Sequence, residues 1–207
     1  MAASSPTTST PTAPASPSRL TARDLALVAA MAGLVAVLGV PGAFYAFGQA
    51  APITLQSMGV MLVGALLGWK RGGLAILLFL ALAAIGLPVL AGGRGGLAVF
   101  VGPTSGYLLG YLLGAMTTGA LVQMRARRLN HAWLAVAILV GGIGVVHLFG
   151  VPGMALRAGL PWDKALMAGL AFVPGDLIKA VLATVVAAGV HRAIPTLLPS
   201  TWAGRQR

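Results

Sequence analysis

Residues 132–150 read AWLAVAILVGGIGVVHLFG, and this stretch decides the fold class of the chain. It contains no Asp, Glu, Lys or Arg. A helix of this length would extend about 28 Å at a rise of about 1.5 Å per residue. The hydrocarbon core of a bilayer is about 30 Å thick. We therefore interpret residues 132–150 as a transmembrane helix.

Five more apolar runs extend the same interpretation over most of the chain. They cover residues 25–40, 53–69, 73–90, 104–124 and 165–191. Of the 207 residues, 58% are hydrophobic and only 8% are charged, whereas soluble domains carry about 25% charged residues. Because so few charges cannot cover a surface that faces water, we predict an all-α, integral membrane bundle of six helices within residues 19–192, surrounded by lipid.

Both ends of the chain differ in composition from this bundle. Residues 1–18 consist almost entirely of Ala, Ser, Thr and Pro, which predicts a disordered tail. Residues 193–207 are predicted to form a basic cytoplasmic tail. Arg19 and Arg23 followed by the run 25–40 also fit a cleavable signal sequence, but the six-helix arrangement needs this run as its first helix.

Lys and Arg residues occur singly or in twos and threes between the apolar runs. Ten of the fourteen lie on the side of the predicted bundle that carries both termini, and three lie on the other side. Since Lys and Arg are enriched in cytoplasmic loops, we predict that both termini are cytoplasmic and that the chain crosses a bacterial plasma membrane several times. The net charge of +11 does not indicate nucleic-acid binding, because the basic residues form no continuous patch.

Small residues recur one helical turn apart in three of the predicted helices, which permits close helix packing in lipid. These stripes consist of Gly102, Gly106, Gly110 and Gly114; of Gly64 and Gly68; and of Ala22, Ala26 and Ala30. For the run 104–124 we favour packing inside the bundle. In the first helix Ala29 and Gly33 add a second small face, so contact with a partner protein is an equally good interpretation.

Residues 172–179, FVPGDLIK, contain the two charges that clearly lie within a predicted span. An Asp or Lys at the centre of a membrane helix costs about 2.5–3.5 kcal/mol. The spacing of three places Asp176 and Lys179 on one helix face, where they partly neutralise each other. Pro174 and Gly175 are expected to restart the helix and to leave Asp176 near an amino end that favours a carboxylate. The pair is either a structural ion pair or part of a ligand site.

Residues 86–96, GLPVLAGGRGG, are predicted to form a loop on the outer side. Gly92 and Gly93 permit backbone conformations and close approaches that other residues do not. Arg94 is the only charge in the loop and is suited to bidentate recognition of a carboxylate. The alternative is a flexible exposed loop; a phosphate-binding loop is disfavoured because no Gly-Lys-Ser/Thr sequence follows.

Polar residues also occur at the starts of two predicted helices. Thr54 and Gln56 begin one, and Tyr107 begins another. Singly, each of these side chains is explained by helix capping. On the predicted topology, however, all of them lie with Asp176 and the Gly-rich loop in the outer half of the bundle. Polar groups that converge within an apolar bundle are typical of a ligand pocket.

Residues suited to catalysis or metal binding are scarce. The chain has three acidic residues and no Cys, and it lacks a Ser-His-Asp set, an HExxH motif and a Walker A sequence. His131 and His147 are isolated, and we interpret both as structural or interfacial. We therefore predict that the protein is not an enzyme and has neither a cofactor nor a metal site.

Four motifs together resemble the BioY family, the biotin-specific substrate-binding (S) components of energy-coupling-factor (ECF) transporters. The motifs are PITLQ at 52–56, GLPVLAGGRGG at 86–96, GPTSGYL at 102–108 and PGDLIK at 174–179. They occur in the order and spacing of the family, and the resemblance covers nearly all of residues 20–192. One departure is Leu90, where many members have an aromatic residue, so aromatic stacking is not expected at this position.

The resemblance implies that the pocket takes up biotin from the extracellular side. Asp176 would accept hydrogen bonds from the ureido N–H groups, and Arg94 or Lys179 would meet the carboxylate. Tyr107 and neighbouring aliphatic side chains would line the ring site.

The resemblance also implies partners, namely a transmembrane coupling subunit and two ATP-binding subunits. The coupling subunit would contact the stripe of Ala22, Ala26 and Ala30. Three alternatives remain open on the residues alone: a self-sufficient vitamin permease, as a monomer or a dimer; a structural membrane subunit without a small ligand; and a carrier of another vitamin.

Overall fold

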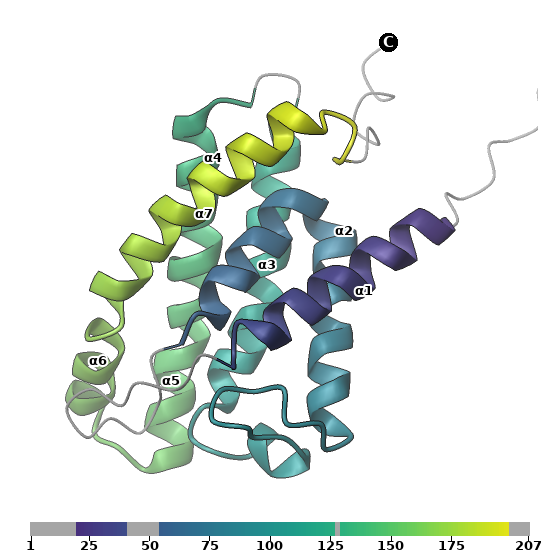
Figure 1. Ribbon diagram of the computed structural model, residues 1–207. Helices are drawn as coiled ribbons and strands as arrows, with labels where there is room; N and C mark the ends of the chain where they lie inside the picture. Colours follow the sequence, from purple (N-terminus) through teal and green to yellow (C-terminus); the bar gives the residue numbers. More distant parts are fainter. Residues whose placement is uncertain (1–19, 41–53, 127–128, 199–207) are drawn as a thin grey trace, which may run out of the picture.

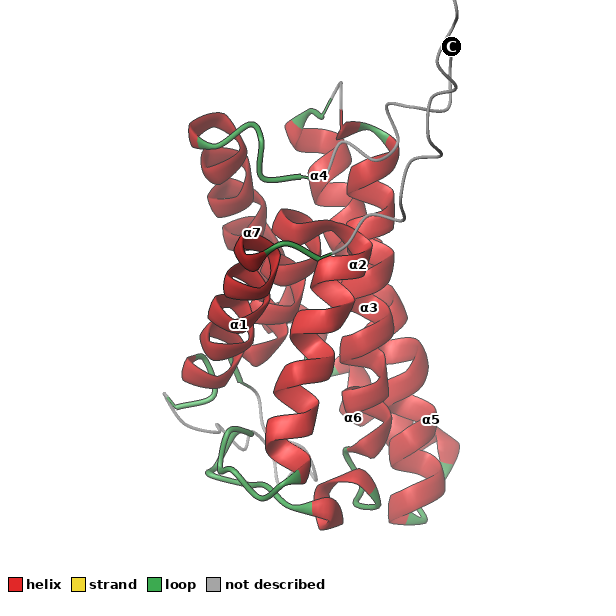
Figure 2. Ribbon diagram, turned by 90° about the vertical axis from the view of Figure 1, so that its right-hand side faces the viewer, coloured by secondary structure: helices red, strands yellow, loops and turns green. Residues whose placement is uncertain are grey.

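The computed structural model describes residues 20–40, 54–126 and 129–198, and within them it contains helices and loops but no strand (Figures 1 and 2). The elements are α1 (Ala22–Val37), α2 (Gln56–Ala84), the short 3-10 helix η1 (Leu97–Phe100), α3 (Ser105–Met124), α4 (His131–Ile138), the π-helix η3 (Leu139–Val145), α5 (Val146–Ala158), α6 (Trp162–Leu170) and α7 (Val173–Ala193). The prediction of an all-α fold is confirmed. The predicted tail 1–18 lies outside the described residues.

α2 folds back on itself and is not one straight helix. Gly68 has φ 76° and ψ 179°, a conformation that is open to glycine but strained for other residues. A straight helix of 29 residues would separate its ends by about 43 Å. Instead, Gln56 at its start hydrogen-bonds to the backbone of Val89 and Ala91, just beyond its end. Residues 56–67 and 69–84 are therefore two arms of a helical hairpin.

Four helical stretches of the described residues are long and apolar enough to cross a membrane, where the sequence predicted six runs. They are Gln56–Ala84, Ser105–Met124, His131–Ala158 and Trp162–Ala193. The numbers differ because the hairpin α2 joins two predicted runs and because α1, with 16 residues, is short for a span of about 20 residues. The prediction of a multi-pass membrane bundle agrees with these four stretches.

Glycines bring α3 into direct backbone contact with its neighbours. A Cβ atom on Gly64 or Gly119 would overlap the backbone across the α2–α3 contact. Gly106, Gly110 and Gly114 of α3 likewise face the backbone of η3 and α5. The predicted packing role of the stripe in the run 104–124 is thus present in the structure for these three glycines.

α1 turns one stripe of small residues away from the bundle. Its buried positions are Asp24, Val28, Ala32 and Val35. The side chains of Ala22, Ala26 and Ala30 are exposed. The packing of the described residues therefore does not use this stripe, which leaves it open to a partner.

One end of the bundle, which we call the basic end, carries Lys70, Arg71, Arg125 and Arg192. Here Arg71 pairs with Asp24 of α1 at 2.5 Å and donates a hydrogen bond to the carbonyl of Leu197 at 3.1 Å. The start of α1 and the end of α7 lie in the upper part of Figure 1, and the loop between α2 and α3 lies at the lower end.

Candidate functional site

A pocket lies toward the end of α3 opposite the basic end. The turn of α2 reaches the carboxyl end of α3, where the N–H of Trp69 donates to Gln123 Oε1 at 3.1 Å, whereas the pocket contacts Tyr107 in the first turn of α3. Five segments supply its lining residues: Thr54, Gln56 and Ser57; Leu90, Ala91 and Arg94; Thr104, Tyr107, Leu108 and Tyr111; Val146 and His147; and Phe172, Asp176 and Lys179. The pocket thus brings together six of the eight predicted ligand residues.

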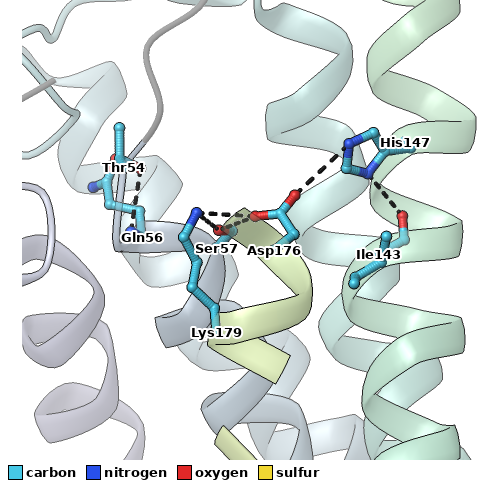
Figure 3. Close-up of polar contacts among 7 residues, drawn as sticks. All are labelled: Thr54, Gln56, Ser57, Ile143, His147, Asp176 and Lys179. Atoms are coloured by element: carbon cyan, nitrogen blue, oxygen red, sulfur yellow. Dashed lines mark hydrogen bonds and ion pairs between the residues drawn. The ribbon is translucent and has the colours of Figure 1, made fainter. Parts of the chain in front are cut away.

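The centre of the pocket wall is a closed polar triangle of three side chains (Figure 3). Lys179 Nζ lies 2.9 Å from Asp176 Oδ1 and donates a hydrogen bond to Ser57 Oγ at 3.0 Å, and the Ser57 hydroxyl donates to Asp176 Oδ1 at 3.0 Å. All three residues are buried, with exposures of 5–8%. Breaking such a pair leaves an unpaired buried charge and costs about 3–5 kcal/mol. Oδ2 of Asp176 makes no bond within the triangle and remains for other contacts.

The start of α7 sets the position of this triangle. α6 and α7 are separated at Ala171 and Phe172, and Pro174 occupies the first turn of α7. Proline suits this position because its missing N–H would have no partner within the helix. Asp176 follows in the first turn, where the helix dipole favours a carboxylate. The predicted restart of the helix before Asp176 is confirmed.

His147 lies on the other side of Asp176 (Figure 3). Its Nε2 is 3.7 Å from Asp176 Oδ2, and its Nδ1 is 3.0 Å from the carbonyl oxygen of Ile143. Tyr107 packs edge-on against both His147 and Phe172, at centroid distances of 5.8 and 5.9 Å. Among the described residues, the buried atoms Tyr107 Oη and His147 Nε2 have no hydrogen-bond partner. His147 thus lines the pocket, a position that its interpretation as structural or interfacial did not anticipate.

The Gly-rich loop forms a tight turn that carries Arg94. Leu90 and Arg94 exchange two backbone hydrogen bonds of 3.1 and 3.2 Å. Gly92 and Gly93 between them have φ values of 76° and 69°, which explains the glycines. Both are exposed and neither lines the pocket, so the structure favours a role in shaping this turn over the predicted ligand contact. The Arg94 side chain does line the pocket, and its Nε donates to the carbonyl of Ala91 at 3.1 Å.

The side-chain amide of Gln56 forms hydrogen bonds with backbone groups. Its Nε2 donates to Val35 O at 3.3 Å and to Val89 O at 2.8 Å, and its Oε1 accepts from Ala91 N at 3.1 Å. Thr54 Oγ1 accepts from the N–H of Gln56 at 3.2 Å, as a helix-start residue does. Gln56, which is only 2% exposed, thus joins α1, α2 and the loop, and this contact pattern favours a positioning role over direct ligand contact.

The charges of the described pocket leave it cationic. Arg94 and Lys179 face one carboxylate, that of Asp176, so an anionic ligand would balance the charges. No group of three His, Cys, Asp or Glu residues that could hold a metal ion occurs in the described part of the chain.

Sequence reasoning missed five polar or aromatic members of the lining. They are Ser57, Thr104, Tyr111, His147 and Phe172. Ser57 and Tyr111 follow predicted site residues by one and four positions, a spacing that was a usable signal for Tyr111 on the same helix face. His147 was detectable as a lone ionisable side chain in an apolar span.

Comparisons with known proteins agree on one family. A model described as "BioY family" matches residues 10–196. The chain is 43% identical over 189 residues to a biotin transporter BioY of Rhizobium etli, and this match covers 87% of this chain and 99% of that protein. It is 47% identical over 187 residues to a biotin transporter BioY of Rhodobacter capsulatus, which covers 85% of this chain and 97% of that protein.

A solved structure shares the fold as well. It is a crystal structure of the S-component for biotin from an ECF-type ABC transporter, and it matches with a TM-score of 0.79 and 34% sequence identity. The match covers 82% of this chain and 91% of the other.

Proposed function

Since this chain belongs to the BioY family, we propose that it is the biotin-binding S component of an ECF-type transporter and that its pocket captures biotin from the extracellular side. Its function is uptake and not catalysis. The observation that carries the proposal is the buried triangle of Asp176, Lys179 and Ser57, which opens onto a pocket with Arg94 at another wall.

The chemistry of biotin matches these groups. Its ureido ring has two N–H donors and one carbonyl, and its valerate chain ends in a carboxylate. Asp176 Oδ2 is free of the triangle and accepts a ureido N–H. Lys179 already binds Asp176 and Ser57, so Arg94 is the cation left for the carboxylate, to which a guanidinium binds with two parallel hydrogen bonds. Tyr107 and Phe172 flank the ring.

The same proposal includes six membrane crossings with both termini in the cytoplasm. The hairpin at Gly68 supplies two short crossings, and α1 supplies another. The bias of Lys and Arg toward the basic end supports a cytoplasmic location of that end, in the plasma membrane. On this topology the pocket opens to the outside, and residues 193–207 belong to the cytoplasmic side.

The partners in this proposal are a transmembrane coupling subunit and two ATP-binding subunits. The exposed stripe of Ala22, Ala26 and Ala30 supports contact with the coupling subunit, because small residues allow close approach between membrane helices. Uptake of biotin by cells that express this chain alone would favour the self-sufficient permease instead.

Calorimetric titration of the purified protein with biotin tests the proposed ligand. We expect saturable binding, which Asp176→Asn weakens by about 10- to 150-fold, since a hydrogen bond to a charged group contributes about 1.5–3 kcal/mol. Lys179→Ala should also weaken binding, because Asp176 then loses the cation that holds its carboxylate in place. Asp163→Asn, the same exchange at an exposed position of α6, is the matched control and should bind like the wild type. Unchanged affinity in both pocket variants would return the pair to a structural role, and no saturable binding by the wild type would refute the proposed function.

A further inference from the structure

His147 occupies a defined place beside the pocket. It is the second residue of α5, directly after the π-helix η3 (Leu139–Val145). Short π-helical segments are rare in proteins, and those that occur often lie at functional sites. Its imidazole is 15% exposed and is held edge-on by Tyr107. The ring orientation is thus fixed by packing as well as by its hydrogen bond to Ile143.

The hydrogen bond to Ile143 also fixes the tautomer of the neutral ring. Nδ1 lies 3.0 Å from the carbonyl oxygen of Ile143, and a carbonyl oxygen only accepts. Nδ1 therefore carries the proton, and in the neutral ring Nε2 presents a lone pair. Nε2 is buried at the pocket and has no partner among the described residues.

Asp176 Oδ2 is a second acceptor at the same place. It lies 3.7 Å from His147 Nε2, and two acceptors cannot hydrogen-bond to each other. His147 Nε2 is a buried acceptor without a partner among the described residues, and such an atom costs about 1–3 kcal/mol. The arrangement is therefore complementary to a ligand N–H group and unfavourable to a ligand carbonyl or carboxylate oxygen, which would add a third acceptor.

We propose that His147 is a specificity-determining ligand residue, whose neutral Nε2 accepts a hydrogen bond from an N–H group of the ligand beside Asp176 Oδ2. The ligand class is a cyclic urea or another ring with an N–H donor. With biotin, which rests on the proposed function above, the donor is one of the two ureido N–H groups. His147 thereby selects for the donor, while Asp176 supplies the charge.

Binding of biotin and of its two singly N-methylated ureido analogues to wild-type protein, His147→Phe and His147→Gln tests this role. His147→Phe keeps the ring shape and removes the acceptor, and should weaken biotin by about 3- to 10-fold. His147→Gln keeps a side-chain oxygen that accepts and should recover part of this loss. One methylated analogue should lose affinity for the wild type but much less for His147→Phe. His131→Phe, at an exposed histidine of the basic end, is the matched control.

Equal affinity of His147→Phe and wild type for biotin, with equal losses for both analogues, would overturn the role of His147. Failure of the wild type to bind biotin would instead refute the proposed function.

Nitrogen NMR of histidine-labelled wild-type protein tests the same role without any pocket variant, and so remains informative if the His147 variants do not fold. We expect an unprotonated Nε2 whose resonance shifts when biotin is added, with His131→Gln and His191→Gln used for assignment. A doubly protonated ring paired with Asp176, or an unshifted Nε2, would overturn the proposal.

Discussion

Asp176 uses its two carboxylate oxygens differently. Oδ1 accepts from Lys179 and Ser57 at 2.9 and 3.0 Å, and these bonds offset the cost of burying the charge. Oδ2 points away from the triangle, toward His147. One residue therefore contributes both to the stability of the α2–α7 contact and to the proposed recognition of the ligand.

A separate prediction is that Arg94 binds the carboxylate of biotin. Arg94→Ala should weaken biotin by about 10- to 150-fold, because a charge-assisted hydrogen bond of about 1.5–3 kcal/mol is lost. It should weaken biotin amide, which lacks the negative charge, by far less. Titration of both ligands into both proteins measures the difference. Equal losses for the two ligands would remove Arg94 from contact with the carboxylate and assign the cation there to Lys179.

Among the elements, the hairpin α2 has the largest effect on the site. Its reversal at Gly68 brings Gln56 beside Val89 and Ala91, although these residues are 33 and 35 positions apart in sequence. The buried amide of Gln56 then holds the loop that carries Arg94 against the start of α2. A straight α2 would place these two parts of the pocket at opposite ends of the bundle.

Gly68→Ala tests the hairpin. The positive φ of 76° costs a residue with a Cβ about 1–3 kcal/mol, and the added Cβ would also meet the amide of Gln123. We expect a lower melting temperature in detergent and weaker biotin binding. Gly33→Ala is the control, because Gly33 is helical and a Cβ there has no neighbour within 4 Å. A melting temperature of Gly68→Ala equal to that of the wild type would contradict the strained turn.

For the whole molecule, the two ends of the bundle differ in what they expose. The pocket lies toward one end. The basic end carries the Lys and Arg side chains, and one of them, Arg71, forms an ion pair with Asp24 of α1. α1 contributes Asp24 and three apolar side chains to the interior and leaves its small face open. The proposed capture of ligand and the proposed contact with a partner thus use different surfaces of the molecule.

Ala26→Leu tests whether these two surfaces have separate roles. The larger side chain should leave the affinity of the purified protein for biotin unchanged and should strongly reduce biotin uptake by cells that contain the complete transporter, because close helix approach at the stripe is blocked. Ala81→Leu, at an exposed position of α2, is the matched control and should permit normal uptake. Normal uptake with Ala26→Leu would move the coupling contact away from α1.

Features that depend on neighbouring residues were predictable from the sequence. Apolar runs of about 20 residues indicate helices in lipid, the positions of Lys and Arg predict an orientation, and the spacing of Asp176 and Lys179 predicts that they pair. The convergence of Thr54, Arg94 and Tyr107 on one pocket was also predictable, because it follows from the order and direction of the helices.

Which atoms remain free for a ligand depends on the tertiary structure. Ser57 hydrogen-bonds to Asp176, which is 119 positions away in the sequence. The side chain of Gln56 is engaged in hydrogen bonds to backbone groups of α1 and the loop. His147, an isolated residue in an apolar run, gains its place from the π-helix before it and from the packing of Tyr107. Hydrogen bonds of this kind depend on distances between segments far apart in the chain, which local periodicity does not contain.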